Sequence, residues 1–431
     1  MRYHALLFLV LTGLLVGCAS KPYELEVMRA PAVYEDGEID RLSVERPKDA
    51  NAYPGMLYAT NRMPTQDAKD RRDFGSEFYG GNADGVVRVG VAHVQVTDST
   101  LDWEAVRRMS TSATRDKELV IHIESVDELG VLSNTRHPFV KNPTPDTPDA
   151  DAAFADLINR QLAQSSEKEI LVFVHGYKTP FDDPVLVATE FWHFMGYDGV
   201  TIAYSWPSTP SWIAYLRDIE SSGNSAREFR LFLQFLADHT DVEKINVLAY
   251  SAGTRMAAET LHNIAIDCSA PHLGHVILVS GDVSAAKVGA LLADDALDKV
   301  DTFTIYNSTG DMALGFSDWL FDRNRIGSSH DALAQLPEAL DFVRSTPKLQ
   351  LINVSDAEDA TKGNGHGYFR NSPWTSSDIL ASLDFHLTPA ERGLIWNDDT
   401  GEWNFPPNYL ETLRESIRQK WENENLGRTF H

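Results

Sequence analysis

The part of the chain from residue 153 onward limits the possible folds most strongly, because strands and helices alternate there at a regular spacing. Short runs are apolar at nearly every position, among them ILVFVHG (170–176), INVLAYS (245–251) and HVILVSG (275–281). Strands of this kind are buried on both faces, as parallel strands are when helices cover the sheet. Between them lie helical stretches such as 224–238, with apolar residues at i, i+3, i+4 and i+7. The pattern predicts βαβ units and an α/β fold with a mostly parallel central sheet and helices on both faces.

The main domain is predicted to span residues 56–385. Its first part, residues 56–140, contains runs such as GVVRVGVAHVQV, whose β-branched residues and partial alternation are typical of strands. We expect these strands to form the antiparallel start of the same sheet, and residues 153–385 to form its alternating core. The proline-rich stretch KNPTPDTPDADA (141–152) leaves a separate N-terminal β domain open as the alternative.

Residues 386–431 follow this domain as a tail. The stretch TLRESIRQKWENE places Leu413, Ile417 and Trp421 on one helical face. We expect this helix to dock on the domain. A helix that binds a partner is the alternative.

The first twenty residues, MRYHALLFLVLTGLLVGCAS, have the form of an export signal. A basic tip is followed by an apolar run that is too short for a comfortable membrane span. The stretch LVGC (15–18) resembles the bacterial lipobox, which implies cleavage of residues 1–17 as a signal peptide and lipidation of Cys18. An ordinary signal peptide with an accidental cysteine is the alternative. Residues 18–55 are polar with scattered prolines, and we predict that they form a tether.

Lipidation predicts where the protein resides. Several acyl chains together anchor a protein stably to a membrane. Ala19 and Ser20 follow Cys18, whereas an aspartate in that place tends to retain lipoproteins at the inner membrane of enteric bacteria. We therefore expect a protein of the bacterial cell envelope, held by Cys18 at the outer membrane and facing the periplasm.

Charge and cysteine content exclude some classes of function. The formal net charge is −25, which argues against a nucleic-acid partner because phosphate binding needs a basic face. We interpret the acidity as a solvated surface. Cys268 is the only cysteine besides Cys18, so an exported chain would have no internal disulfide framework.

A serine at the tip of a buried strand indicates catalysis. In VLAYSAGTR (247–255) the strand ends at Ser251, and Ala252 and Gly253 follow. This is the nucleophile-elbow pattern G-x-S-x-G with Ala249 in place of the first glycine. A strained strand-to-helix turn lifts the serine hydroxyl above the sheet, and larger side chains two residues before or after it would collide across the turn.

Further motifs accompany the serine, namely YATNR (58–62), FVHGY (173–177), YSWPS (204–208) and GHGYF (365–369), beside AYSAG (249–253) itself. Together they resemble the α/β-hydrolase superfamily and, more narrowly, a bacterial family of uncharacterised α/β hydrolases, over roughly residues 56–385. The resemblance implies that the backbone N–H groups of Tyr177 and Ala252 form an oxyanion hole.

A serine needs an imidazole within hydrogen-bond reach, and the imidazole needs a carboxylate that fixes its tautomer. The order in this fold is serine, acid, histidine. TFTIYNSTGD (302–311) ends a predicted strand and offers Asp311. The loop after the next strand offers His366 among Gly363, Gly365 and Gly367. We predict a catalytic triad of Ser251, Asp311 and His366.

Competing residues remain for both roles. Asp282, after the strand that follows the serine, is the main alternative acid. Asp356 and Asp359 are better explained as solvated loop residues. His175 precedes the serine and is interpreted as a structural turn residue. Other histidines after the serine include His262, His272, His275, His330 and His386.

Aromatic and apolar residues gather on three predicted loops near these positions. They could line an acyl pocket, or they could form a small separate core beneath long loops. The residues are Trp206, Trp212 and Tyr215; Met312, Leu314, Phe316 and Trp319; and Tyr368, Phe369 and Trp374.

The sequence therefore predicts a lipid-anchored serine hydrolase that acts on a small-molecule or lipid ester. No cofactor and no metal are expected, since a triad accounts for His366 better than a metal site does. An acyltransferase with the same triad is one alternative, and a catalytically silent envelope scaffold or adaptor is another. Nothing in the residues selects an acyl chain length.

Overall fold

The computed structural model describes residues 22–35, 37, 39, 41–42, 53, 55–139, 150–314, 326 and 337–428, with the side chains of all of them except 68, 212, 337 and 422–428. Several predictions fall outside this part of the chain: the signal peptide 1–17, Cys18, residues 141–149, Phe316, Trp319 and His330. None of the described helices is both long and apolar enough to cross a lipid bilayer.

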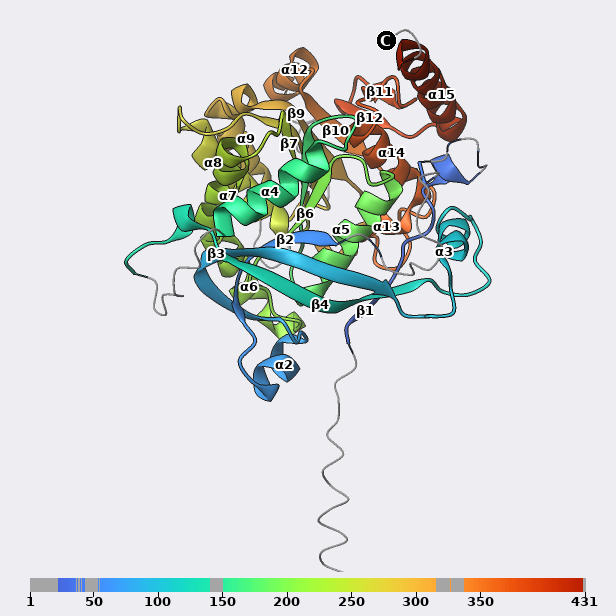
Figure 1. Ribbon diagram of the computed structural model, residues 1–431. Helices are drawn as coiled ribbons and strands as arrows, with labels where there is room; N and C mark the ends of the chain where they lie inside the picture. The colour runs from blue at the N-terminus through green and yellow to red at the C-terminus, as the bar shows by residue number, and fades with distance from the viewer. Residues whose placement is uncertain are drawn as a thin grey trace, which may run out of the picture.

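The described strands form one twelve-stranded sheet, ordered β1-β4-β3-β2-β6-β5-β7-β8-β9-β10-β12-β11 (Figure 1). Their bounds are β1 Glu24–Glu26, β2 Met56–Pro64, β3 Tyr79–Val96, β4 Val120–Val131, β5 Glu169–Val174, β6 Val200–Ser205, β7 Lys244–Tyr250, β8 Leu273–Val279, β9 Val300–Asn307, β10 Leu349–Asn353, β11 Ile395–Asn397 and β12 Glu402–Asn404. Every pairing from β2–β6 through β10–β12 is parallel. The predicted α/β fold with a mostly parallel sheet is confirmed.

Helices cover both faces of this sheet (Figure 1). Successive residues of β5 enter two different cores: Leu171 and Phe173 face one, and Ile170, Val172 and Val174 face the other. This explains why the strand is apolar at every position. The first core includes residues of α3 (Trp103–Ser110), α5 (Asp182–Phe194), α13 (Tyr368–Asn371), α14 (Pro373–Leu383) and α15 (Tyr409–Arg428). The second includes residues of α4 (Ala150–Leu162), α7 (Ala226–His239), α8 (Gly253–Ala265), α9 (Ala285–Ala293) and α12 (Pro337–Ser345).

The strands before residue 140 are continuous with this sheet. β2 pairs with β3 in antiparallel fashion and with β6 in parallel. The predicted antiparallel start of the sheet is therefore confirmed, and the alternative of a separate β module does not hold for residues 56–131.

The predicted tether over residues 18–55 is wrong for residues 22–35. β1 pairs with β4, and the 3₁₀-helix η1 (Ala32–Tyr34) is buried. The Val33 backbone N–H donates to Ser377 Oγ at 3.1 Å, and the Tyr34 hydroxyl donates to the Phe194 carbonyl at 2.6 Å. The apolar residues here follow neither a helical nor a strand period, so their burial leaves no sequence pattern.

The tail beyond residue 385 is also part of the folded domain. β11 and β12 extend the sheet past β10, and Leu413 and Ile417 of α15 are fully buried. Within the same region the Arg392 Nε atom lies 2.8 Å from Asp378 Oδ1, and both side chains are fully buried. Hydroxyl groups of Tyr306 and Tyr409 also donate to the Asp378 carboxylate, at 2.6 and 3.1 Å.

We expect Asp378→Ala to lower the free energy of unfolding by about 3–5 kcal/mol, because it leaves the Arg392 charge buried without its partner. Urea denaturation of the variant beside the wild type measures the change. Asp341→Ala is the control, since the Asp341–Arg344 pair lies at the surface and should contribute little. An equal loss in both variants would contradict the prediction.

Candidate active site

Ser251 lies on a sharp turn between β7 and α8. Its φ angle is +52°, in the left-handed region that residues other than glycine rarely adopt. A Cβ atom added to Gly253 would lie 2.3 Å from the His175 carbonyl oxygen, and one added to Gly176 would lie 2.8 Å from Ser251 Cβ. The turn therefore packs so tightly against the end of β5 that these two positions require glycine.

Three predicted residues meet above the carboxyl ends of the parallel strands. His366 Nε2 lies 2.8 Å from Ser251 Oγ, and His366 Nδ1 lies 2.7 Å from Asp311 Oδ2. An ionised carboxylate only accepts, so Nδ1–H donates to Asp311, and Nε2 is left to accept the Ser251 hydroxyl proton. All three side chains are buried. Chemically, this arrangement can draw a proton from the serine as its oxygen attacks an electrophile.

Neighbouring loops hold the histidine and the acid in place. Ser280 Oγ donates to the His366 carbonyl oxygen at 2.6 Å, and Asp311 Oδ1 accepts from the backbone N–H groups of Ala313 and Leu314, both at 3.1 Å. These donors fix the orientation of the Asp311 carboxylate.

Close packing explains why the residue before His366 is a glycine. Gly365 has a φ of +68°, and a Cβ atom there would lie 2.3 Å from the Gly310 carbonyl oxygen. The Met312 backbone N–H also donates to the Asn364 carbonyl at 3.1 Å. The histidine loop and the acid loop are thus packed backbone against backbone.

The alternative acids have other partners. Asp282 Oδ2 lies 3.0 Å from Arg255 Nε and accepts from the Tyr215 hydroxyl at 2.9 Å. Asp359 pairs with Arg29 at 2.5 Å. Among the carboxylates in the described ranges, Asp311 is the one that is hydrogen-bonded to His366.

His175 lies in the turn after β5 and packs beneath it. Its ring stacks on Trp206 with the centroids 4.8 Å apart and the planes 1° from parallel. Burial first, and the Arg62 charge second, lower the pKa of His175 well below its usual range, so this imidazole stays neutral. These contacts agree with the structural role predicted for His175.

The other described histidines that follow Ser251 in the chain contact groups outside this site. Their ring nitrogens lie beside Asp294 for His262, Asp301 for His272, Thr302 for His275 and Glu167 for His386.

Arg62, the last residue of YATNR, is fully buried. It bonds to the YSWPS motif and to the turn that follows FVHGY, so it joins three of the predicted motifs in space. Its Nε donates to Ser205 Oγ, its Nη1 to the Ser208 carbonyl and its Nη2 to the Thr179 carbonyl, each at 2.9 Å. Burial lowers the pKa of Arg62 to about 9, with Asp218 opposing the shift. Sequence reasoning gave Arg62 no role, although an arginine inside an apolar strand run was the signal that could have found it.

Two backbone donors face the region of the serine. Gly176 packs against Ser251, so the next peptide N–H, that of Tyr177, lies in the same turn. Ala252 directly precedes α8, where helix N–H groups lack partners within the helix. Neither the Tyr177 nor the Ala252 N–H donates a hydrogen bond to another described residue. Both are available for an anionic oxygen.

Of the seven predicted pocket residues whose side chains are described, four are buried core residues. Tyr215 is different, because its ring lies edge-on to Tyr177 at 5.0 Å between centroids. Those buried are Trp206, Leu314, Tyr368 and Phe369.

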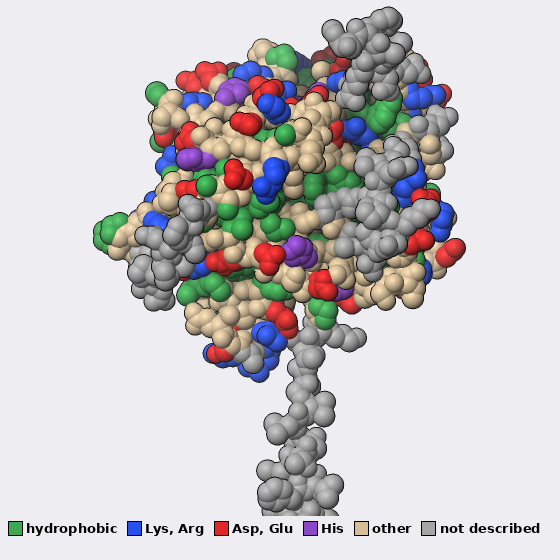
Figure 2. Space-filling model, viewed as in Figure 1, with side chains coloured by type: hydrophobic (Ala, Val, Ile, Leu, Met, Phe, Trp, Pro, Cys, Tyr) green, Lys and Arg blue, Asp and Glu red, His purple; other side chains and the backbone are tan. Residues whose placement is uncertain are grey.

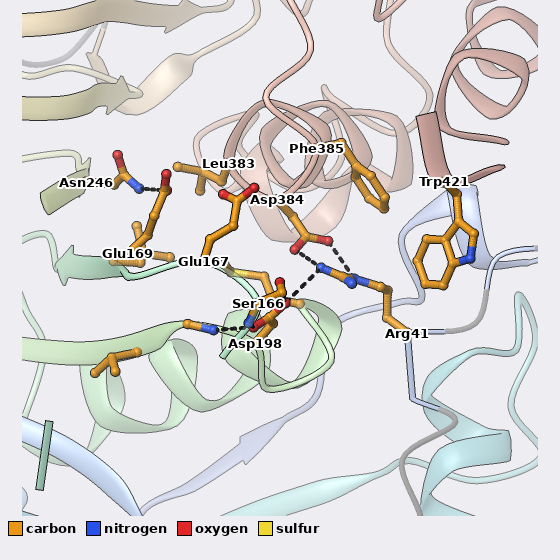
Figure 3. Close-up of a pocket in the computed structure, with 14 residues that line it drawn as sticks. Arg41, Ser166, Glu167, Glu169, Asp198, Asn246, Leu383, Asp384, Phe385 and Trp421 are labelled. Carbon is orange, nitrogen blue, oxygen red and sulfur yellow. Dashed lines mark hydrogen bonds and ion pairs between the residues drawn. The ribbon is translucent and has the colours of Figure 1, made fainter. Parts of the chain in front are cut away.

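The opposite edge of the sheet carries a separate cavity of about 80 Å³ at the amino ends of β5, β6 and β7 (Figure 3). Arg41 crosses it, paired with Asp384, and its guanidinium carbon lies 5.3 Å from the centre of the Trp421 ring. Ser251 follows the carboxyl end of β7, so this cavity is no part of the serine site.

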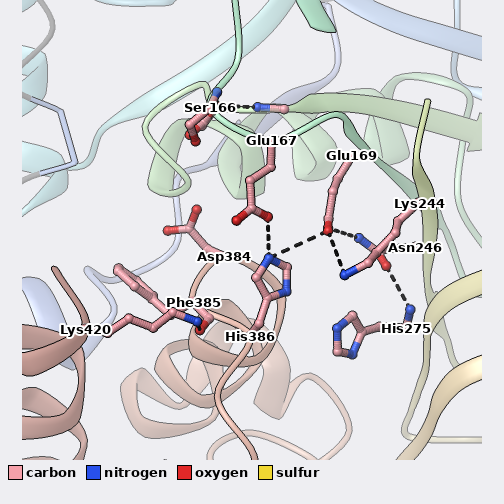
Figure 4. Close-up of polar contacts among 12 residues, drawn as sticks. Ser166, Glu167, Glu169, Lys244, Asn246, His275, Asp384, Phe385, His386 and Lys420 are labelled. Atoms are coloured by element: carbon pink, nitrogen blue, oxygen red, sulfur yellow. Dashed lines mark hydrogen bonds and ion pairs between the residues drawn. The ribbon is translucent and has the colours of Figure 1, made fainter. Parts of the chain in front are cut away.

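Glu167, Glu169 and His386, next to that cavity, are close enough to hold a metal ion (Figure 4). His386 Nε2 lies 2.5 Å from Glu167 and 3.6 Å from Glu169. Lys244 Nζ lies 3.4 Å from Glu169, whose other oxygen accepts from Asn246 at 2.8 Å. A cationic side chain therefore already neutralises part of this group.

We expect Gly253→Ala to destabilise the protein by about 1–3 kcal/mol, because the added methyl would overlap the His175 carbonyl. Gly289→Ala in α9 is the matched control. A Cβ there meets nothing within 4 Å, so the change should stabilise by about 0.5–1 kcal/mol through helix propensity. Urea denaturation measures the free energy of unfolding of both variants. Equal values for the two would contradict the close packing of the Ser251 turn against His175.

The family comparison agrees with this geometry. Residues 150–382, more than half of the 431-residue chain, match the family described as Alpha/beta hydrolase of unknown function (DUF900). No curated protein matches the chain. The matched segment runs from α4 to α14 and contains Ser251, Asp311 and His366. The chain is therefore a member of the α/β-hydrolase family of unknown function DUF900.

Proposed function

We propose that this protein is a serine hydrolase with a Ser251–His366–Asp311 triad. The observation that supports it best is the hydrogen-bonded series from Ser251 Oγ through His366 to Asp311, with the serine at a positive φ. Strained backbone of this kind is found where function requires it.

In the proposed reaction Ser251 Oγ attacks a carbonyl carbon as its proton passes to His366 Nε2. The oxygen anion that forms accepts from the N–H groups of Tyr177 and Ala252. His366 then returns the proton to the leaving group, and the acyl group stays on Ser251. Water repeats these steps and releases the acid. Asp311 keeps Nδ1 protonated throughout and stabilises the imidazolium.

We propose a carboxylic ester as the substrate. Ester acyl transfer is common on this fold, and this argument is one of analogy. An acyltransferase would use the same residues with a different acceptor in place of water, so tests with water alone and with added alcohol acceptors separate the two.

We also propose that Cys18 is lipidated and holds the enzyme in the bacterial cell envelope. The support is the sequence LVGC (15–18) after an apolar run. Incorporation of labelled palmitate into the wild type, and equally into Cys18→Ser, would exclude this anchor.

A fluorophosphonate probe tests the nucleophile. We expect the wild type to gain the mass of one adduct and Ser251→Ala to gain none, since only an activated serine reacts with such probes. Intact-mass spectrometry is the measurement. Absence of an adduct on a folded wild-type protein would remove the hydrolase proposal and favour a catalytically silent scaffold.

Ester kinetics then test the acid. We expect Asp311→Asn to lower kcat by about 10³–10⁴-fold, because an amide in place of the carboxylate favours the wrong histidine tautomer. Asp282→Asn is the control, since Asp282 bonds Arg255 and Tyr215 and not His366. A larger loss in the Asp282 variant would assign the acid to Asp282.

A further inference from the structure

Three exposed apolar side chains lie on loops at the carboxyl edge of the sheet. Ile213 is 76% exposed in the 3₁₀-helix η3 (Trp212–Ala214), and Leu216 is 61% exposed in α6 (Tyr215–Asn224). Met312, directly after Asp311, is 65% exposed. Similar exposure occurs elsewhere, at Phe139, Ile266 and Ile395, so these three side chains are singled out by their place on the edge that carries Ser251.

Contacts of a neighbouring residue connect the segment of Ile213 and Leu216 to the serine. Tyr215 stands between Ile213 and Leu216, and its ring packs edge-on against Tyr177. The Tyr215 hydroxyl donates to Asp282, whose own backbone N–H donates to the Ser251 carbonyl at 3.4 Å. The segment that carries Ile213 and Leu216 is therefore linked to the turn of Ser251, and Met312 directly follows Asp311 in the chain.

The first described residues of the chain lie on the same edge. Pro22 and Tyr23 line a hollow with Arg71 and Arg72 of α2 (Ala68–Phe74). The Tyr23 hydroxyl also donates to Asp183 Oδ1 at 2.7 Å, in the first turn of α5. The first turn of α5 follows Tyr177 closely in the chain. Tyr23 is therefore held near the loop between β5 and α5, which begins beside Ser251.

Helix α2 connects this start to α6. The Arg217 guanidinium lies 6.0 Å from the centre of the Phe74 ring, and Arg217 Nη2 donates to the Gly81 carbonyl at 3.0 Å. Figure 1 shows β1, α2 and α6 together on the lower side of the molecule. Contacts thus run from Tyr23 through α2 and α6 to the border of the site.

The distance from this edge to Cys18 is short. Four peptide steps separate Cys18 from Pro22, and an extended chain spans at most ~3.6 Å per residue, or roughly 14 Å in all. A lipid chain on Cys18 would therefore hold this edge close to the bilayer surface.

Charge favours an apolar contact with the bilayer over an electrostatic one. The net charge is −25, which repels anionic lipid headgroups. Figure 2 shows acidic side chains interspersed with basic ones over the visible face, as on a solvated surface. The exposed side chains of Ile213, Leu216 and Met312 are the groups at this edge that can enter the headgroup region.

We propose that the surface of Ile213, Leu216 and Met312 docks on the bilayer that holds Cys18, and that the substrate is an ester carried by that bilayer. The substrate part rests on the proposed serine hydrolase. The docking part needs only the anchor, which raises the effective concentration of a weakly binding surface.

Fluorescence quenching tests the docking without any catalysis. The full-length lipidated protein is placed in phosphatidylcholine vesicles that contain a nitroxide lipid, in a Cys268→Ser background, and a fluorophore is attached at Leu216→Cys. The control is Ile266→Cys, because Ile266 is 66% exposed and follows α8, which runs from Ser251 to the opposite edge. Quenching at position 216 and little at 266 is expected. Equal quenching at both, or none at 216, overturns the docking.

Ester kinetics test the substrate. The ratio of turnover of a vesicle-borne ester to turnover of a dissolved short ester should fall at least about tenfold in Ile213→Ser/Leu216→Ser. It should stay at the wild-type value in Ile266→Ser. An unchanged ratio in the double variant overturns the bilayer substrate. If the wild type does not turn over the dissolved ester, the proposed hydrolase activity is contradicted. The quenching result does not depend on that activity and still tests the docking.

Discussion

The site depends on the close approach of two turns, the one after β5 and the one after β7. Gly176 and Gly253 let the backbones meet at distances that no Cβ atom would allow. Ser251 reaches its left-handed conformation inside this contact, so its hydroxyl points away from the sheet. Strain of this kind persists only when the surroundings fix the backbone on every side. Arg62 supplies much of that support, because its guanidinium joins β6 and the loops after β5 and β6.

A second contact, between the loops after β9 and β10, sets the position of the other two residues. Gly365 lies against Gly310, so any shift of the histidine loop moves the acid loop as well. His366 and Asp311 therefore behave as one unit that is placed against Ser251. This coupling keeps the hydrogen bonds of 2.7 and 2.8 Å in register, although the loops come from different strands.

Sequence reasoning reached much of this arrangement, and its gaps have physical causes. Apolar residues at every position of β5 identify a strand buried on both faces, and chain order led to Asp311 and His366, which the structure brings to Ser251. The sequence predicts a tether over residues 18–55, although residues 22–35 are packed on the domain, because a segment buried by scattered contacts has no period to detect. The three-residue strands β11 and β12 are too short for a pattern. Arg62 works through tertiary contacts, which a linear sequence does not display.

The amino and carboxyl edges of the sheet differ in the side chains that they carry. At the amino edge, charges are paired: Arg41 with Asp384, and His386 with Glu167. The fully buried Arg392–Asp378 pair joins the tail to α14 in the same layer. Such contacts favour one rigid arrangement of strands and helices. The carboxyl edge carries Ser251 in its strained backbone conformation. Paired charges at the amino edge can offset the cost of the strained Ser251 backbone at the carboxyl edge, since the free energy of folding is set by the whole molecule.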